Sequence, residues 1–255
     1  MNPLQITDTN ISAAWAKSFL DLMGPRGSQR HPAVVSIDNI DGSPEIEVPS
    51  IRDRLDKELK EQGASLCATV AGTLFPTSMW NPTLPNNAEA LYARYGKAWA
   101  KIGRYPANRK GVYFRRLTAF SPLGFAGNPV NQLKFIVETY RGGNHRKSAL
   151  QAAILDPTRD HTNNRQKGFP CLQQVSFTPL KNDRLSVTGY YATQYHFEKA
   201  YGNYLGLYGL GRFMAHQLDM QLAQVVCVAS VVSLGNASKS QLQLLNDDVY
   251  RLTAT

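Results

Sequence analysis

Residues 169–218, FPCLQQVSFTPLKNDRLSVTGYYATQYHFEKAYGNYLGLYGLGRFMAHQL, decide the fold. Two runs within this stretch, residues 172–177 and 185–191, are rich in β-branched and aromatic side chains and predict strands. Residues 181–183 (KND) are a turn signal between the two strands. Residues 200–218 are rich in Gly, Tyr and Leu and predict a long helix. The stretch therefore predicts a strand, a turn, a second strand and a helix, in that order.

Helical and strand patterns alternate on both sides of this stretch. Apolar residues at helical spacing predict helices at Ile11–Met23 and 128–140. A third helix is expected at 50–62, where Ser50 can cap it and acids and bases are mixed along it. Short β-branched or apolar runs predict strands, which we expect at 32–38, 150–155 and 224–232. Residues 68–75 are compatible with either a helix or an extended segment, because Gly72 and Pro76 interrupt the pattern. Without internal repeats or low-complexity linkers, the sequence predicts one compact domain of mixed α/β structure over residues 1–255.

The composition is that of a globular protein. The 255 residues include 28 Lys+Arg and 19 Asp+Glu, a formal net charge of +9, and 43% are hydrophobic. This balance excludes wholesale disorder, which needs fewer apolar residues and more charge. The positive charge favours anionic partners such as nucleotides, polyglutamylated cofactors or nucleic acid, although charged runs are more often solvated surface. No nucleic-acid-binding motif is present, so nucleic acid is not an expected partner.

The sequence contains no secretory, membrane or metal-binding signal. Its first residues, MNPLQITDTN, have neither the basic nor the apolar segment of a signal peptide. The longest apolar run, residues 224–234, is shorter than the roughly 20 residues that span a bilayer. Cys67, Cys171 and Cys227 are too few and too widely spaced for a disulfide framework or a zinc site. We therefore expect a reducing, cytoplasmic setting, no membrane partner and no bound metal.

Cys171 is the candidate reactive residue. It follows Pro170 at the junction of a polar loop and a strand. A thiol at such a place acts as a nucleophile if its surroundings lower its pKa, because the thiolate is the reactive form. Considered alone, a free cysteine is more often a small buried apolar residue. Cys67 and Cys227 lie in apolar runs and are expected to be inert core thiols.

The order of motifs around Cys171 resembles the thymidylate synthase family. In that family a Pro-Cys-His sequence opens the catalytic strand, and a Gly-x-Pro-Phe-Asn segment opens the long core helix. Pro170-Cys171 and Tyr201-Gly202-Asn203 occupy these places here. The further matches are Trp80, Tyr95-Gly96-Lys97 with Trp99, Arg146-Lys147, and Gln241-Leu242-Gln243-Leu244, which resembles a strand of the family. The resemblance covers residues 80–244, and residues 1–75 are the divergent part.

The resemblance implies a fold, a dimer and a chemistry. The fold is α/β (α+β), with a large mixed sheet and flanking helices, and two such sheets pack back to back in a homodimer. Cys171 would add to C6 of a pyrimidine, which makes C5 nucleophilic towards the one-carbon unit of 5,10-methylenetetrahydrofolate. The Asn203 amide would bond the N3/O4 edge of the base. Tyr95 would orient water or the leaving nucleophile, and Trp80 would form a wall of the pocket.

Several family positions are changed in this chain. Leu172 stands where the family has His, Ala192-Thr193 where it has Arg-Ser, and Tyr195 where it has Asp. The segment that normally carries a catalytic Glu, residues 68–75, contains no acid. Loss of the phosphate-binding Arg points to an unusual substrate, because bidentate Arg–phosphate contacts are strong. The residues expected to contact the substrate or its anion instead are Thr193, Arg26, Arg30, Arg146 and Lys147, of which Arg146 and Lys147 would come from the second subunit.

Two functions are compatible with these residues. The first is a divergent thymidylate-synthase-like transferase that moves a methyl or hydroxymethyl group to C5 of a pyrimidine nucleotide or nucleoside through Cys171. The second is a non-catalytic dimer of the same fold that binds a nucleotide or a protein partner. Reactivity of the Cys171 thiol distinguishes the two. Asn203 has a structural alternative as a helix N-cap, and His196 is expected to be a structural residue rather than an acid or base.

Overall fold

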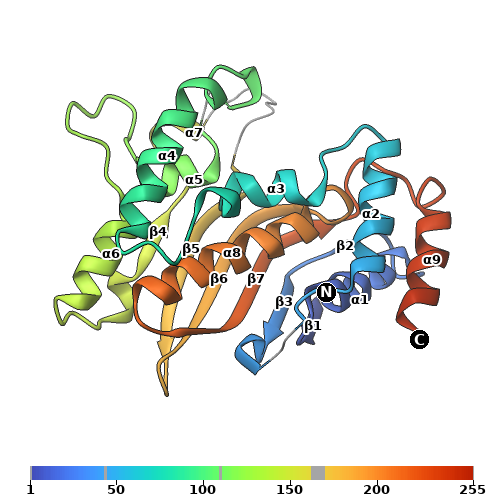
Figure 1. The fold of residues 1–255 in the computed structure, drawn as a ribbon. Coiled ribbons are helices and arrows are strands. Elements are labelled where there is room, and N and C mark those ends of the chain that lie inside the picture. Colours follow the sequence, from blue (N-terminus) through green and yellow to red (C-terminus); the bar gives the residue numbers. More distant parts are fainter. Residues whose placement is uncertain (1, 43–44, 109–110, 162–169, 255) are drawn as a thin grey trace.

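The computed structural model describes residues 2–42, 45–108, 111–161 and 170–254, which form a mixed α/β structure (Figure 1). The strands are β1 (Leu4–Asp8), β2 (Gln29–Arg30), β3 (Ala33–Asp38), β4 (Gln151–Ala153), β5 (Leu172–Leu180), β6 (Arg184–Tyr195) and β7 (Gln221–Ser233). The helices are α1 (Ile11–Met23), α2 (Pro49–Glu61), α3 (Cys67–Leu74), α4 (Asn87–Ile102), α5 (Tyr113–Thr118), α6 (Gln132–Arg141), α7 (Pro157–Asp160), α8 (Tyr201–Gln217) and α9 (Gln243–Thr253). A π-helical turn, His196–Ala200, directly precedes α8.

The described strands form one mixed sheet of seven strands. Their order is β1-β3-β7-β6-β5-β4. The short strand β2 is not part of this order and pairs with β7. The pairs β1–β3 and β6–β7 are parallel, and the other pairs are antiparallel. Because parallel neighbours need a crossover, the chain passes from β6 to β7 through α8, which lies across one face of the sheet (Figure 1). The large mixed sheet with flanking helices agrees with the predicted fold class.

The face of the sheet under α8 carries the core. Val187 on β6 lies opposite Val225 on β7, and both side chains are fully buried. α8 buries most of its residues between the sheet and α3. A Cβ atom at Gly202 would lie 2.5 Å from Val70 Cβ, so glycine at this position lets α3 pack directly on α8.

The opposite face of the sheet is covered less. Val34 on β3 and Tyr190 on β6 both lie opposite Val228 on β7. The two valines are half-buried, and Tyr190 is 41% exposed. The described residues therefore leave apolar side chains accessible at the centre of this face.

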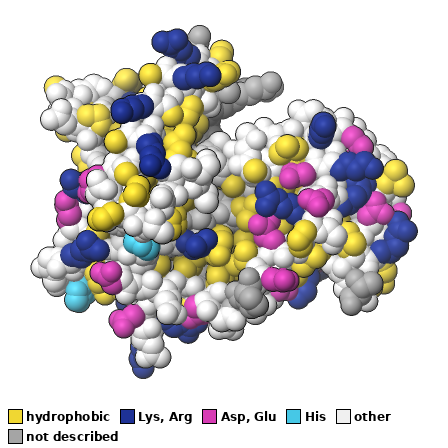
Figure 2. All heavy atoms as spheres, in the orientation of Figure 1, with side chains coloured by type: hydrophobic (Ala, Val, Ile, Leu, Met, Phe, Trp, Pro, Cys, Tyr) yellow, Lys and Arg dark blue, Asp and Glu magenta, His cyan; other side chains and the backbone are white. Residues whose placement is uncertain are grey.

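Charged side chains are not spread evenly over the face that Figure 2 shows. Lys and Arg are mixed with Asp and Glu over much of this face, whereas its upper left part carries Lys and Arg without Asp or Glu between them (Figure 2). Among the residues with described structure, no helix is both long enough and apolar enough to cross a membrane.

Several predicted elements are confirmed. α1 has the predicted bounds, Ile11–Met23, and β5 and β6 form the predicted pair of strands. The ambiguous residues 68–75 are mostly helical and belong to α3. α6 begins at Gln132 rather than at 128, because the Asn131 side chain accepts a hydrogen bond from the Lys134 amide at 3.0 Å and caps the helix.

The prediction of a strand at Gln241–Leu244 was wrong. Residues 241 and 242 form a turn, and α9 begins at Gln243. Leu242, Leu245 and Val249 recur at helical spacing and are fully buried, so a helix and not a strand brings them all to the core.

Candidate functional site

One cavity brings Cys171 and Asn203 together. It has a volume of about 350 Å³ and lies between α3, the start of α5, the residues around the start of β5, the end of β6 and the start of α8. Its wall includes the polar or aromatic side chains of Thr69, Thr73, Tyr113, Arg116, Thr193, Tyr195 and Lys199. This space is called the Cys171 cavity below.

The pairing of β5 with β6 positions the Cys171 thiol. The Ala192 amide donates a hydrogen bond to the Cys171 carbonyl at 2.8 Å, and the Thr193 hydroxyl lies 3.8 Å from Cys171 Sγ and donates to it. Cys171 is half-buried, whereas Cys67 and Cys227 are each only 2% exposed. Burial also raises the pKa of Cys227 to about 12. Cys171 is therefore the cysteine that a dissolved ligand reaches most easily.

The π-helical turn determines where Asn203 lies. Since His196–Ala200 is already helical backbone, Asn203 is the third residue of α8 and not its N-cap. The N-cap interpretation is therefore wrong. Asn203 is 4% exposed and faces the Cys171 cavity. Lys199, four residues earlier, is exposed and lines the same cavity, as expected for helical neighbours.

His196 anchors this turn inside the protein. Its Nε2 atom lies 2.6 Å from the Ser18 hydroxyl, and its ring stacks on Trp15 with 5.6 Å between centroids. The ring is fully buried, and burial lowers its pKa from 6.5 to about 3. His196 does not line the Cys171 cavity, so its structural interpretation is the one that the geometry supports.

The tyrosine beside Cys171 is Tyr113 and not Tyr95. The Tyr113 phenol interacts with the backbone of Cys171 and Leu172, and burial and the nearby thiol raise its pKa to about 12. Tyr95 instead packs in the core against Phe114, with 4.7 Å between ring centroids, and does not line the cavity. Sequence reasoning missed Tyr113 and Lys199. No local signal exists for Tyr113, whereas the spacing of four residues between Lys199 and Asn203 is a signal that could have identified Lys199.

Trp80 lies on the other side of α3. Its indole nitrogen donates to Asn87 Oδ1 at 3.0 Å, and its ring contacts Phe75 edge to face. There it lines a cavity of about 590 Å³, which we call the Trp80 cavity. Trp80 therefore does not form a wall of the Cys171 cavity.

Arg26 and Arg30 are engaged near the N-terminal helix. Arg30 is fully buried, and its Nε donates to Asp21 Oδ1 at 2.6 Å while its other nitrogens donate to backbone carbonyls. Arg26 forms an ion pair with the same Asp21 carboxylate. Neither residue lines the Cys171 cavity.

Arg146 and Lys147 are exposed and do not line the cavity. They lie at a short 3₁₀ turn, Lys147–Ala149, just before β4. Their assignment to an anion bound by the second subunit stays a prediction. Among the site residues expected from the sequence, the Cys171 cavity thus contains Cys171, Thr193 and Asn203.

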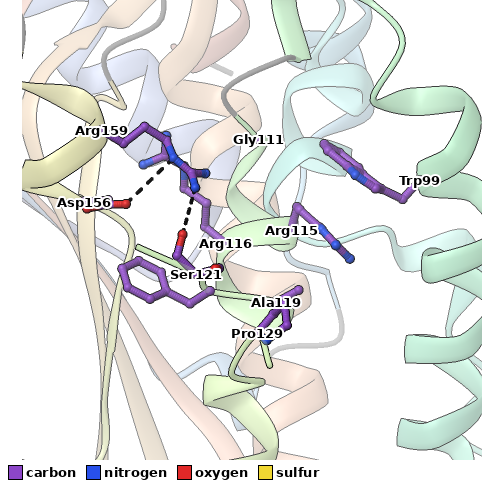
Figure 3. A pocket seen from close by; sticks show the side chains of 10 residues that line it. Trp99, Gly111, Arg115, Arg116, Ala119, Ser121, Pro129, Asp156 and Arg159 are labelled. Atoms are coloured by element: carbon purple, nitrogen blue, oxygen red, sulfur yellow. Dashed lines mark hydrogen bonds and ion pairs between the residues drawn. The ribbon is translucent and has the colours of Figure 1, made fainter. Parts of the chain in front are cut away.

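Another cavity adjoins the Cys171 cavity and is lined by three arginines, Arg115, Arg116 and Arg159 (Figure 3). It is called the arginine cavity below. It has a volume of about 240 Å³ and shares Gly111 and Arg116 with the Cys171 cavity. Arg116 pairs with Asp160 at 2.8 Å between Nη2 and Oδ1, and both side chains are buried. Figure 3 shows Arg159 at one side, where it donates to the Ser121 carbonyl at 2.8 Å.

The balance of charge around this arginine cavity is positive. Arg159 lies 3.8 Å from the Asp156 carboxylate, and Arg116 is neutralised by Asp160. Arg115 lies over the ring of Trp99, 5.4 Å from its centroid, on the side opposite Arg159 (Figure 3). Among the described residues, three guanidinium groups thus face two carboxylates, and their balance is one positive charge beside the Cys171 cavity.

The described residues offer no metal site and no evident folate subsite. No group of three or more His, Cys, Asp or Glu side chains within them is arranged to hold a metal ion. The volume of the Cys171 cavity, about 350 Å³, is near the lower end of the range for small-molecule sites and fits one nucleoside-sized ligand. That volume leaves no space for a folate beside such a ligand within the described wall.

No family model matches the chain, and no curated protein matches it. Membership of the thymidylate synthase family therefore stays a prediction that rests on the order of its motifs.

Proposed function

We propose that this protein is a divergent thymidylate-synthase-like transferase that acts at C5 of a pyrimidine nucleotide or nucleoside. The observation that carries the proposal is the convergence of Cys171, Thr193 and Asn203 on one cavity. Cys171 directly precedes β5, Thr193 lies on β6 and Asn203 lies on α8, and their order in the sequence is the order that the resemblance implies. A half-buried thiol and a buried amide that share a ligand-sized space support addition chemistry on a polar heterocycle.

The chemical step begins with the Cys171 thiolate. A bond forms between Sγ and C6, and the electron pair of the C5–C6 double bond moves towards C5 and O4. The Asn203 amide donates to O4, where negative charge develops, and accepts from N3–H. A one-carbon electrophile supplied by a co-reactant then forms a bond to C5. Solvent water takes the C5 proton, and the electron pair of that C–H bond restores the C5–C6 double bond and expels Cys171 as the thiolate.

Two cations are placed to hold an anionic substituent of the substrate. The exposed ammonium of Lys199 lines the Cys171 cavity itself. Arg115 contributes to the positive charge of the adjoining arginine cavity. These side chains would replace the phosphate-binding Arg that the sequence lacks, since charge-assisted hydrogen bonds to phosphate are strong.

The carbon donor is a separate part of the proposal. The resemblance implies 5,10-methylenetetrahydrofolate and a methyl or hydroxymethyl product. The volume of the Cys171 cavity leaves no space for a folate beside a nucleotide within the described wall, so the step above names its co-reactant only as a one-carbon electrophile.

One observation favours the alternative of a non-catalytic, nucleotide-binding protein. No described side chain in the wall of the Cys171 cavity is a carboxylate or an imidazole. General acid–base catalysis usually relies on such groups. The same cavity would bind a pyrimidine without converting it.

Tritium release from C5-labelled pyrimidines tests the proposal. The substrates are dUMP, UMP, dCMP, CMP and their nucleosides, each with and without methylenetetrahydrofolate. The variant is Cys171→Ser, and Cys227→Ala is the matched control because it removes a buried thiol instead. We expect release that Cys171→Ser abolishes and Cys227→Ala retains. No release from any substrate, with Cys171 alkylated no faster than a free thiol, would leave the non-catalytic alternative.

We also propose that two copies pack through the less covered face of the sheet. Its accessible apolar residues, Val34, Val228 and Tyr190, support this arrangement, because an exposed apolar patch on a sheet often marks an interface. Light scattering after size-exclusion chromatography would report a dimer for the wild type and a monomer for Tyr190→Lys. A wild-type monomer at micromolar concentration would contradict the proposal.

A further inference from the structure

The Trp80 cavity is larger than the Cys171 cavity and lies on the opposite side of α3. Its volume is about 590 Å³, within the range of small-molecule sites. Phe75, Trp80 and Tyr208 give it aromatic walls, and Ala71 and Gly72 of α3 give it a smooth apolar side. Figure 2 shows hydrophobic side chains gathered across the centre of this face of the molecule.

α8 contributes one stripe of side chains to this cavity. Leu205, Tyr208 and Arg212 follow one another at spacings of three and four residues, so they lie on one face of the helix. None of the three is fully buried, although most of α8 is. The chain therefore leaves this face of a core helix accessible from the cavity.

Gly72 leaves space that no side chain of the described structure fills. It lies inside α3, and a Cβ atom built at this position would have no heavy-atom neighbour within 4 Å. Glycine in a helix costs about 1 kcal/mol relative to alanine. In contrast to Gly202, where a Cβ would clash, no packing constraint accounts for glycine here. An occupant of the cavity that lies against α3 would account for it.

One cation of the cavity has no carboxylate partner among the described residues. Arg52 pairs with Glu47, with 3.1 Å between Nη1 and Oε1, and with Asp56, with 3.8 Å between Nε and Oδ2. Arg212 forms no ion pair with a described residue, and its guanidinium lies over the Tyr208 ring, 5.8 Å from the centroid. This cation–π contact orients the guanidinium at the edge of the aromatic wall. A ligand with one negative charge would give the Arg212 guanidinium an ion-pair partner.

We propose that the Trp80 cavity binds a flat aromatic molecule that carries a single negative charge. The ring system lies between Trp80, Tyr208 and the surface of α3 at Gly72, and the anion pairs with Arg212. A carboxylate, a sulfonate and a singly ionised phosphate share this chemistry. The site is separate from the Cys171 cavity and does not depend on the function proposed for that cavity.

Binding of 8-anilinonaphthalene-1-sulfonate, followed by fluorescence and calorimetry, tests the proposal. N-phenyl-1-naphthylamine, which has the same rings without the sulfonate, is the neutral probe. Gly72→Leu places a side chain in the open space, and Arg212→Gln removes the charge. Arg115→Gln is the matched control, since Arg115 also lies over an aromatic ring, but in the arginine cavity. Circular dichroism and thermal unfolding verify that every variant is folded.

We expect one molecule of the sulfonate to bind the wild type. Gly72→Leu weakens binding of both probes by tenfold or more, because it occupies the space of the rings. Arg212→Gln weakens binding of the sulfonate about tenfold and leaves the neutral probe unchanged, because only the charge-assisted contact is lost. Arg115→Gln and Cys171→Ser bind both probes like the wild type. The proposal is overturned if Gly72→Leu retains wild-type affinity, if Arg212→Gln affects both probes equally, or if only Arg115→Gln weakens binding.

Discussion

The Cys171 cavity and the Trp80 cavity share α3 as a wall and differ in chemistry. α3 presents Thr69 and Thr73 to the Cys171 cavity, and Ala71 and Gly72 to the Trp80 cavity. The helical period separates these residues, because positions three or four apart share a face. One short helix thus gives one ligand space a polar wall and the other an apolar wall. Substitutions in and around α3 should therefore alter one cavity, both cavities or neither.

The largest expected effect comes from Asp160→Asn, which acts on the side of the Cys171 cavity. Asp160 is fully buried and pairs with Arg116, which is 5% exposed and lines that cavity. Breaking a buried ion pair costs about 3–5 kcal/mol, because one charge remains without its partner. Urea unfolding should show this loss. Asp219→Asn is the control, since Asp219 is 84% exposed in its ion pair with Arg141 and should change stability by less than about 0.5 kcal/mol.

Gly202→Ala should disturb both cavities. The new Cβ would lie 2.5 Å from Val70 Cβ and 2.8 Å from the Cys67 carbonyl oxygen, so α3 must move away from α8. Overpacking of this kind costs about 1–3 kcal/mol. Thermal unfolding measures the loss of stability, and the sulfonate probe measures the change in the Trp80 cavity. An unchanged melting temperature would show that the helices are not in direct contact.

Acidification tests the π-helical turn His196–Ala200, which carries Lys199 and leads into α8. Burial lowers the pKa of His196 to about 3 in the folded protein, from an ordinary value of 6.5. Between these values the unfolded chain binds a proton at this side chain and the folded protein does not. The free energy of unfolding therefore falls as the pH falls through this window, by about 1.4 kcal/mol per pH unit for this group.

Urea unfolding of the wild type and of His196→Gln, from pH 7 to pH 4, isolates this contribution. The variant should lose less stability than the wild type as the pH falls, whatever its stability at pH 7. His145→Gln, at an exposed histidine, should keep the slope of the wild type. Equal slopes for all three proteins would contradict the assignment.

The smallest expected effect is a gain of stability from Gly72→Ala in the Trp80 cavity. The new methyl group has no neighbour within 4 Å, and alanine favours a helix over glycine by about 0.5–1 kcal/mol. Thermal unfolding should show a slightly higher melting temperature. Gly63 also has open space around it, but its backbone has φ of +67°, which disfavours a side chain. Gly63→Ala should therefore destabilise the protein instead. A loss of stability in Gly72→Ala would mean that the space beside α3 is not open.

Local patterns predicted the parts of the fold that local forces decide. Ile11–Met23 has regular apolar spacing, and the polar turn at 181–183 separates two clear strands, so both predictions held. α4 (Asn87–Ile102) was missed because its buried side chains are few, namely Asn87, Leu91 and Tyr95. The start of α9 was assigned to a strand because Gln241-Leu242-Gln243-Leu244 resembles a strand of the family, and four residues are too short to show a helical period.

The site was predictable only where the motif order extended over several elements. Cys171, Thr193 and Asn203 follow one another at spacings that a strand pair and a helix bring together, and they do share a cavity. The assignments of Tyr95 and Trp80 to the site rested on short motifs whose alignment nothing else in the sequence fixed. Both side chains lie outside the Cys171 cavity. The Tyr113 side chain reaches Cys171 because the start of α5 lies near the start of β5. The residues next to Tyr113 in the sequence give no signal of this contact.

The position of β3 has a consequence for the kinetics of folding. β3 lies between β1 and β7, with Ala33 opposite both Leu4 and Ala229. As the polypeptide is synthesised, β1 and β3 leave the ribosome long before β7 exists. The nascent chain therefore has an unpaired apolar strand edge until β7 has been synthesised. High contact order of this kind slows folding and increases the time during which aggregation competes with it. The sheet is therefore expected to close only after β7 has left the ribosome.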